Sequence, residues 1–239
     1  MIAKALAQNG AAKVFISGRR ADVLAKAAAA LGPSVHPIVC DVSSPESLAS
    51  AVSEVSSSAG FLNLLVCNAG IGGPQVPMPT AETSLEEWAS ANLNHGIDSY
   101  VRTFEVNTAA VWYTTMAFLP LLGKGNESRN VTQTSQVVVT SSIAAFNKMS
   151  PGGYAYGQSK AAVNLLVKQL SVVLPQWNIR YHHSHPQAAF LTRMKLTAYV
   201  RTRANAICPG RKSSKIGSPP TQLHIAAKLI FTCSSSLSK

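Results

Sequence analysis

The chain has 239 residues and a formal net charge of +11 at pH 7, and 46% of its residues are hydrophobic. This length and apolar content suit one globular domain with its own core, and no apolar run approaches the roughly 20 residues of a membrane span. The four cysteines have no paired spacing, which argues against a disulfide framework. A membrane-spanning protein and a small disulfide-rich domain are therefore excluded.

The chain opens inside a helix: residues 1–10 carry Ile2 and Leu6 on one helical face and end at Gly10. Apolar runs and helical stretches then alternate. The pattern predicts strands at 13–17, 35–40, 62–67 and 135–140, and helices at 21–31, 46–56, 100–122 and 156–174. Strands separated by helices indicate parallel βαβ units. The predicted fold class is α/β, a Rossmann-type doubly wound parallel sheet.

Polar residues follow several of these strands. Asp41, Asn68-Ala69-Gly70 and Ser142 all stand where a predicted strand ends. Ligands of doubly wound sheets bind outside the carboxyl ends of the strands, so this edge is where we expect the chemistry. Asp41 has a second interpretation as an ordinary turn or cap residue, because Asp-Val-Ser-Ser-Pro is typical of a helix start.

Tyr156 and Lys160 form the most informative pair. They are four residues apart, so in a helix they share one face, and an ammonium beneath a phenol favours the phenolate. Such a phenol can act as a general acid or base, and the hydroxyl of Ser142 could hold a substrate oxygen within its reach. On its own the spacing is weak, because an exposed helix can carry it by chance.

Five elements in order make the chain resemble a classical short-chain dehydrogenase/reductase. They are Cys67-Asn-Ala-Gly70, with Cys for the family's first Asn, then Phe104-Glu-Val-Asn107, Val139-Thr-Ser-Ser142, Tyr156-x-x-x-Lys160 and Asn205-Ala-Ile-Cys-Pro-Gly210. The likeness covers about residues 1–180 and 204–210.

The resemblance implies a role for each matching residue. Tyr156 would be the proton donor and acceptor, Ser142 would orient the carbonyl, and Lys160 would bind the nicotinamide ribose and tune Tyr156. Asn107 would hold a water that relays protons to Lys160, although a buried amide paired with backbone is an alternative. The cofactor would be contacted by a further set: Asp41 at the adenine, Asn68, Ala69 and Gly70 on the adenosine side, and Pro209 and Gly210 beside the nicotinamide.

Cofactor choice depends on Gly18-Arg19-Arg20, at the end of the first predicted strand. A carboxylate in this place selects NAD by binding the ribose 2′-hydroxyl, whereas an arginine accommodates a 2′-phosphate. Arg19 and Arg20 therefore predict NADP(H), with NAD as the alternative; exposed, solvated arginines would have no such role.

The family's first strand and its Gly-x-x-x-Gly-x-Gly turn are not found ahead of the first helix or elsewhere in the sequence. That turn would hold the pyrophosphate at a helix N-terminus, and that strand would lie at the centre of the sheet. We therefore expect a Rossmann sheet that lacks its first strand and also its last. An inactive remnant that no longer binds cofactor is the alternative to an active enzyme.

The C-terminal part departs from the family pattern. Residues 1–180 carry twelve Lys and Arg against ten Asp and Glu, whereas residues 181–239 carry nine against none. The predicted organisation is an incomplete Rossmann domain over 1–180, an aberrant basic insertion at 181–203, a strand and Pro-Gly segment of the same domain at 204–210, and a disordered tail outside the family at 211–239. Unspliced or frame-shifted coding sequence is our hypothesis for the insertion and tail.

Scattered cations can attract nucleic acid or acidic membranes, but no nucleic-acid motif accompanies them. His182, His183 and His185 have no Cys, Asp or Glu near them in sequence, so we expect a loop and no metal site. The prediction is a cytoplasmic oxidoreductase that interconverts a small-molecule carbonyl and a secondary alcohol, 3-oxoacyl-carrier-reductase-like, without nucleic-acid or membrane partners. Family members associate through the helices matching 100–122 and 156–174, which implies a homodimer or homotetramer.

Overall fold

In a computed structural model of the chain, residues 2–184 and 223–229 are described, and the strands among them form a six-stranded sheet in the order β2-β1-β6-β3-β4-β5. Every strand pair in it is parallel. The strands are β1 (Ala11–Gly18), β2 (Val35–Val39), β3 (Leu64–Cys67), β4 (Gln136–Thr140), β5 (Arg180–Ser184) and β6 (Leu223–Leu229). The predicted α/β class with a parallel sheet is confirmed.

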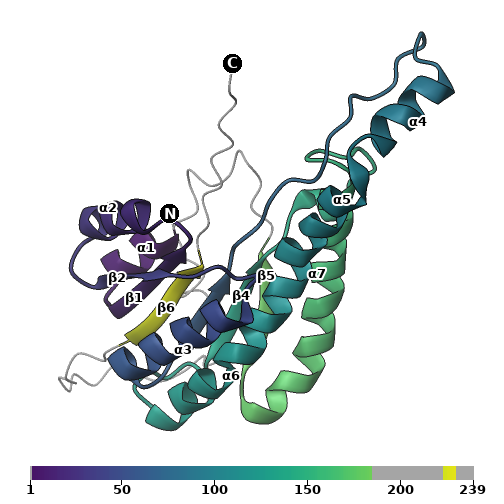
Figure 1. The fold of residues 1–239 in the computed structure, drawn as a ribbon. Helices are drawn as coiled ribbons and strands as arrows, with labels where there is room; N and C mark the ends of the chain where they lie inside the picture. Colours follow the sequence, from purple (N-terminus) through teal and green to yellow (C-terminus); the bar gives the residue numbers. More distant parts are fainter. Residues whose placement is uncertain (1, 185–222, 230–239) are drawn as a thin grey trace.

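Helices join the strands (Figure 1). The α-helices are α1 (Ile2–Gln8), α2 (Ala21–Leu31), α3 (Pro45–Ala59), α4 (Leu85–Leu93), α5 (Gly96–Phe104), α6 (Ala110–Ser128) and α7 (Tyr154–Val173). A π-helical turn, η1 (Glu105–Ala109), joins α5 to α6, and the 3₁₀ turns are η2 (Ile143–Ala145) and η3 (Leu174–Trp177). The helix predicted over 100–122 is therefore a longer helical region with a widened turn at its centre.

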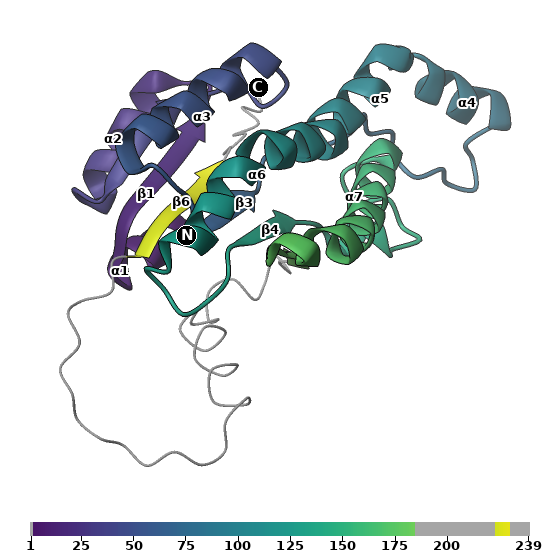
Figure 2. The same ribbon diagram turned by 90° about the horizontal axis from the view of Figure 1, so that it is seen from below.

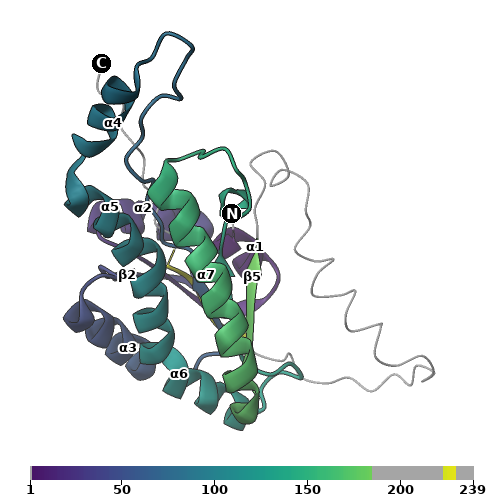
Figure 3. The same cartoon turned by 90° about the vertical axis from the view of Figure 1, so that its right-hand side faces the viewer.

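Two hydrophobic clusters hold the layers together. On one face of the sheet, α1 and α2 pack on Val14 and Ile16 of β1. On the other face, α3, α6 and α7 share a larger cluster with the inward residues of β3 and β4, including Leu65 and Val139. Figure 2 shows α2 and α3 beside the β1 end of the sheet, and Figure 3 shows α5 continuing into α6, with α7 alongside them. Strands that are covered on both faces consist mostly of apolar residues, so these strands could be predicted from apolar runs in the sequence.

The centre of the sheet differs from the prediction. The prediction left the place of the family's first strand empty, but β6 lies between β1 and β3 and runs parallel to both. Residues 223–229 therefore belong to the sheet, and the prediction of a disordered tail is wrong for them. Backbone groups of β1 and β3 facing an empty centre would stay unpaired, and a short Leu- and Ile-containing segment supplies their partners.

The other edge of the sheet also differs. The predicted basic insertion begins at residue 181, yet β5 continues to Ser184 and pairs with β4 along its length. Tyr181 is only 4% exposed, and its hydroxyl lies 3.0 Å from Thr115 Oγ1 in α6. His182 and His183 are strand residues of β5, not loop residues. The remainder of the insertion, the predicted strand at 204–210 and the tail apart from β6 lie outside the described residues.

The position of β6 generates a prediction for Ala226, which pairs with Leu65. Ala226→Pro removes a backbone N–H from a central strand, and each buried group left unpaired costs about 1–3 kcal/mol. We expect the free energy of unfolding, measured by urea denaturation, to fall by at least that amount. Ala226→Gly keeps the N–H and is the matched control with a smaller loss. An unchanged denaturation midpoint for Ala226→Pro would contradict the placement of β6.

Candidate active site

Tyr156 and Lys160 lie on one face of α7, as predicted. The ammonium of Lys160 is 5.9 Å from the centroid of the Tyr156 ring. Lys160 is only 3% exposed, whereas Tyr156 is half-buried. The buried cation therefore lies behind a phenol that solvent can still reach.

The ammonium of Lys160 is held by the end of β4. Its Nζ donates a hydrogen bond of 2.8 Å to the main-chain oxygen of Thr140. Burial lowers the pKa of Lys160 from 10.5 to about 8, because desolvation disfavours the charged form. A pKa near 8 still leaves most of the side chain charged at pH 7.

Asn107 lies in the π-helical turn and is completely buried. Its Nδ2 donates to the main-chain oxygen of Ile71 at 2.9 Å and to Ser159 Oγ at 3.0 Å, and its Oδ1 accepts from the N–H of Ile71 at 2.8 Å. The side chain thus ties the loop after β3 to α7. This is the buried amide paired with backbone that we gave as the alternative, and a water-holding role stays a prediction.

Gly70 brings the loop after β3 close to both of these side chains. A Cβ at this position would lie 3.1 Å from Asn107 Oδ1 and 3.3 Å from Lys160 Nζ. The absence of a side chain at Gly70 keeps the space in front of the amide and the ammonium open. The element Asn68-Ala69-Gly70 therefore adjoins the candidate catalytic pair, as expected.

A second close approach fixes the start of α7. The N–H of Gly73 donates to the main-chain oxygen of Gly152 at 2.8 Å. Gly152 has φ +86°, and a Cβ there would lie 2.9 Å from the Tyr156 ring. A side chain at Gly152 would be strained and would push on the phenol. The glycine therefore lets the loop before α7 pack directly against Tyr156.

The structure separates the two serines that follow β4. Ser141 is buried, and its hydroxyl donates to Asn164 Oδ1 at 2.7 Å. Ser142 is more exposed, and its Oγ accepts from the N–H of Ala144 at 3.2 Å. Ser142 is therefore the less buried of the two serines, and its hydroxyl is not used by another side chain among the described residues. The segment after it reaches α7, because a Cβ at Gly157 would lie 3.0 Å from the main-chain oxygen of Ala144.

The remaining predicted residues after β3, Asn68 and Ala69, lie beside the end of β4 or are buried next to it. Asn68 Oδ1 accepts a hydrogen bond of 2.8 Å from Thr140 Oγ1, and Ala69 is buried. Thr140 therefore holds Asn68 through its hydroxyl and Lys160 through its carbonyl. The ends of two neighbouring strands and one helix are joined at a single residue.

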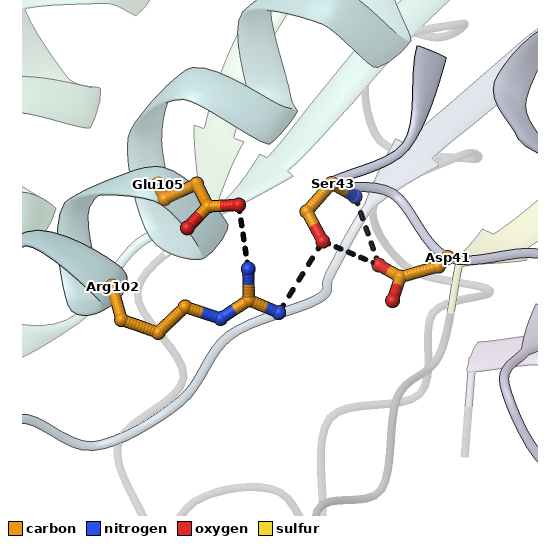
Figure 4. Close-up of polar contacts among 4 residues, drawn as sticks. All are labelled: Asp41, Ser43, Arg102 and Glu105. Carbon is orange, nitrogen blue, oxygen red and sulfur yellow. Dashed lines mark hydrogen bonds and ion pairs between the residues drawn. The ribbon is translucent and has the colours of Figure 1, made fainter. Parts of the chain in front are cut away.

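Asp41 stands after β2, in a chain of polar contacts that continues to α5 (Figure 4). Its Oδ1 accepts from the N–H of Ser43 at 2.9 Å and from the hydroxyl of Ser43 at 2.7 Å. Burial acts to raise the pKa of Asp41, but the Ser43 hydrogen bonds and the charges of Arg19 and Arg102 outweigh it and lower the pKa. The helix cap is Ser44, so Asp41 is a turn residue but does not cap α3.

Arg19 and Arg20 are exposed beyond the end of β1. The ends of β1 and β2 are joined there by a 2.9 Å hydrogen bond from the N–H of Cys40 to the oxygen of Gly18. Arg19 therefore lies close enough to Asp41 to act on its pKa. Pro209 and Gly210, predicted beside the nicotinamide, lie outside the described residues.

Several features of the site could not be predicted from the sequence. The π-helical turn at Asn107, the Thr140 carbonyl beneath Lys160 and the contact of Arg102 with Ser43 depend on tertiary packing, and no spacing rule marks them. Only the position of Gly152 could have been found from the sequence, because two glycines in succession before a helix indicate a tight turn. Between residues 2 and 184, no cluster of His, Cys, Asp or Glu could hold a metal ion.

A parallel doubly wound sheet with this site defines the class of NAD(P)-binding Rossmann oxidoreductases. The family profile described as short chain dehydrogenase matches residues 1–203, and so includes the stretch 181–203. The chain belongs to the short-chain dehydrogenase/reductase family.

Named relatives agree with this placement. Short-chain dehydrogenase/reductase PhomF′ of Diaporthe leptostromiformis is 37% identical over 218 residues, which cover 90% of this chain and 73% of the relative. The rhamnolipids biosynthesis 3-oxoacyl-[acyl-carrier-protein] reductase of Pseudomonas aeruginosa is 30% identical over 72% of this chain and 60% of its own length. The alcohol dehydrogenase of Thermococcus sibiricus, solved with 5-hydroxy-NADP, has a TM-score of 0.58 and 28% identity over 76% of this chain and 68% of that structure.

Helices long and apolar enough to cross a membrane are absent from the described part of the chain. Family members act on small molecules, and the class of reaction is oxidation and reduction.

The buried ammonium of Lys160 predicts a dependence of stability on pH. Its folded pKa of about 8 lies below the ordinary 10.5, so between these pH values the unfolded chain binds more protons and stability rises with pH. The rise should total about 3 kcal/mol and should be lost in Lys160→Met. Urea denaturation of the cofactor-free protein from pH 7 to 10.5 measures it.

Lys168→Met, at an exposed position of the same helix, is the matched control and should keep the rise. Parallel stability curves for the wild type and Lys160→Met would contradict the burial of a charged Lys160.

Proposed function

We propose that the chain is an NADP(H)-dependent oxidoreductase that interconverts a carbonyl and a secondary alcohol. The observation that carries the proposal is the buried ammonium of Lys160 beneath the ring of Tyr156, at the strand ends where Gly70 leaves space. This is the arrangement that moves a proton to or from an oxygen atom.

Tyr156 is the proposed acid and base. In reduction its hydroxyl gives a proton to the carbonyl oxygen, and in oxidation its phenolate takes the proton from the alcohol. The Lys160 ammonium stabilises the phenolate by its charge. The partly buried hydroxyl of Ser142 donates a hydrogen bond to the same substrate oxygen and holds it near the phenol. The nicotinamide cofactor supplies or accepts the hydride.

Asn107 has a proposed place in returning the proton. Its two amide N–H groups are already used by Ile71 and Ser159, so a relay water would be bound through an oxygen of this residue. Such a water would lie near Lys160 and connect it to solvent.

The residues at the strand ends fit a dinucleotide. Gly70 leaves room in front of Lys160, which would bind the ribose next to the nicotinamide. Asn68 and Ala69 would line the adenosine side, and Asp41 offers a carboxylate oxygen to the adenine. Pro209 and Gly210 would lie beside the nicotinamide.

The choice of NADP(H) is supported by charge. Arg19 and Arg20 follow β1, where a 2′-phosphate would lie, and no carboxylate stands in that segment. The Thermococcus sibiricus relative was solved with an NADP derivative, which agrees with this choice. NAD(H) is the alternative, favoured if the arginines are only solvated.

The substrate class is proposed from the relatives. The Pseudomonas aeruginosa relative is named a 3-oxoacyl reductase, so a 3-oxoacyl ester is the probe we favour. Assembly is proposed through the helices α5 to α7. These leave large apolar side chains exposed, among them Trp112, Tyr113 and Leu165, which suits a homodimer or homotetramer.

An inactive remnant is the second candidate. The observation in its favour is that the sequence contains no Gly-x-x-x-Gly-x-Gly turn to hold the pyrophosphate. Such a chain would keep the fold and the Tyr156 arrangement without binding cofactor.

Cofactor titration separates the candidates. We expect saturable binding of NADPH, followed by its fluorescence, and at least about 10-fold weaker binding of NADH, since phosphate contacts of arginine are charge-assisted. Arg19→Glu should reverse the preference, while Lys168→Met should leave it unchanged. Saturation with neither nucleotide at millimolar concentration would favour the remnant.

Replacing Tyr156 tests the proton role. Tyr156→Phe keeps the ring but removes the hydroxyl, and general acid–base catalysis contributes about 10²–10⁴-fold. We expect kcat for NADPH-dependent reduction of ethyl acetoacetate to fall at least about 100-fold with NADPH binding preserved. Tyr154→Phe, two residues earlier, is the matched control. Unchanged turnover in Tyr156→Phe would contradict the assignment.

A further inference from the structure

Arg102 links helix α5 to the loop after β2, which carries Asp41. Arg102 was predicted from the sequence neither as a catalytic nor as a cofactor-binding residue. It lies in α5, 59 residues from Ser43 in sequence. Its Nη2 donates to Ser43 Oγ at 3.3 Å, and its Nη1 donates to Glu105 Oε1 at 2.5 Å. Figure 4 shows the guanidinium lying between Glu105 and Ser43, with Asp41 beyond.

The direction of each hydrogen bond from Arg102 through Ser43 to Asp41 follows from which atoms can donate. A guanidinium has only N–H donors, so Ser43 Oγ must accept from Arg102. The proton of the Ser43 hydroxyl is then free to go to Asp41 Oδ1, 2.7 Å away. Arg102 therefore occupies the acceptor side of the Ser43 hydroxyl and reinforces the hydrogen bond that this hydroxyl donates to Asp41.

The Ser43 hydroxyl decides which oxygen Asp41 offers to a ligand. Oδ1 already accepts two hydrogen bonds, from the N–H and the hydroxyl of Ser43. No hydrogen bond from the residues described here reaches Oδ2. The loop itself is held by a 2.9 Å hydrogen bond from the N–H of Asp41 to Ser47 Oγ. Asp41 therefore presents one free, ionised acceptor at a set angle.

We propose that Arg102 is a positioning residue that acts through Ser43 to aim Asp41 Oδ2 at the amino group of the cofactor's base. This inference rests on the proposed function, because it takes the ligand to be an adenine dinucleotide. A carboxylate oxygen accepts a hydrogen bond from the 6-amino group of adenine but repels the 6-oxo group of hypoxanthine. The arrangement thus selects the base, at the end of the cofactor away from the hydride.

A purely structural role for Arg102 is the competing explanation. Arg102 and Glu105 form an i,i+3 ion pair, and each side chain is about two-fifths exposed; an exposed pair of this kind stabilises a helix only weakly. If that were its whole role, replacing Arg102 would lower the melting temperature of the protein slightly. It would not change the choice between bases.

The test compares NADPH with reduced nicotinamide hypoxanthine dinucleotide phosphate, titrated against the full-length chain. The wild type should bind NADPH about 10-fold or more tightly than the hypoxanthine analogue. Arg102→Met should weaken NADPH binding about 3- to 10-fold and leave the analogue nearly unchanged, so that the ratio of the two Kd values falls. Arg102→Lys should restore little of the wild-type ratio of Kd values, because an ammonium lacks the planar geometry with which the guanidinium donates to both Glu105 and Ser43. Lys168→Met controls for the lost charge.

A double-mutant cycle then separates action through Ser43 from a general effect. In the Ser43→Ala background, Arg102→Met should change the Kd ratio no further, since the hydroxyl on which it acts is gone. A wild-type ratio in Arg102→Met, or fully additive effects of the two substitutions, would overturn this inference alone. A wild-type chain that binds neither nucleotide would overturn the proposed function, and this inference with it.

Discussion

The hydrogen bond from Lys160 Nζ to the carbonyl of Thr140 is the contact on which the site depends. It places a buried cation at the junction of β4 and α7, where desolvation must be offset by hydrogen bonding and by the groups nearby. Gly70 leaves space in front of this cation, and Tyr156 lies above it. If Lys160 were displaced, the phenol would lose its charged neighbour and the strand ends would lose their link to α7.

Around this contact, the polar residues form two linked groups. One group joins Asn107, Ile71 and Ser159 and fixes the loop after β3 against α7. The other joins Asp41 and Ser43 to Arg102 in α5. Since α5 continues through the π-helical turn into α6, the helical region that holds Asn107 also reaches the loop after β2. In the proposed function, residues positioned by this one helical region would contact both ends of the dinucleotide.

Most of the fold could be predicted from the sequence because apolar periodicity is local. The strands at Leu65 and Val137 and the helix at Tyr156 follow from it. In the candidate site, Asp41, Asn68 and Ser142 were placed by strand ends and Tyr156 with Lys160 by a helical spacing. Asn107 was named only because the sequence resembles a known family. What failed was non-local: β6 is a short segment within a basic, acid-free tail, and its pairing with β1 depends on a gap that only the folded sheet creates. The same holds for Tyr181, whose burial is decided by Thr115 on another element.

The central position of β6 has a consequence for how the protein is made. Val14 pairs with Ile225, so the chain must be synthesised beyond residue 225 before the middle of the sheet can close. Contacts this distant in sequence slow folding, and domains ordinarily fold as the chain emerges from the ribosome. Until β6 has been synthesised, β1 and β3 each present an open edge, the kind of surface that recruits chaperones or neighbouring nascent chains. Synthesis of residues 223–229, more than any local propensity, sets the moment at which the middle of the sheet can close.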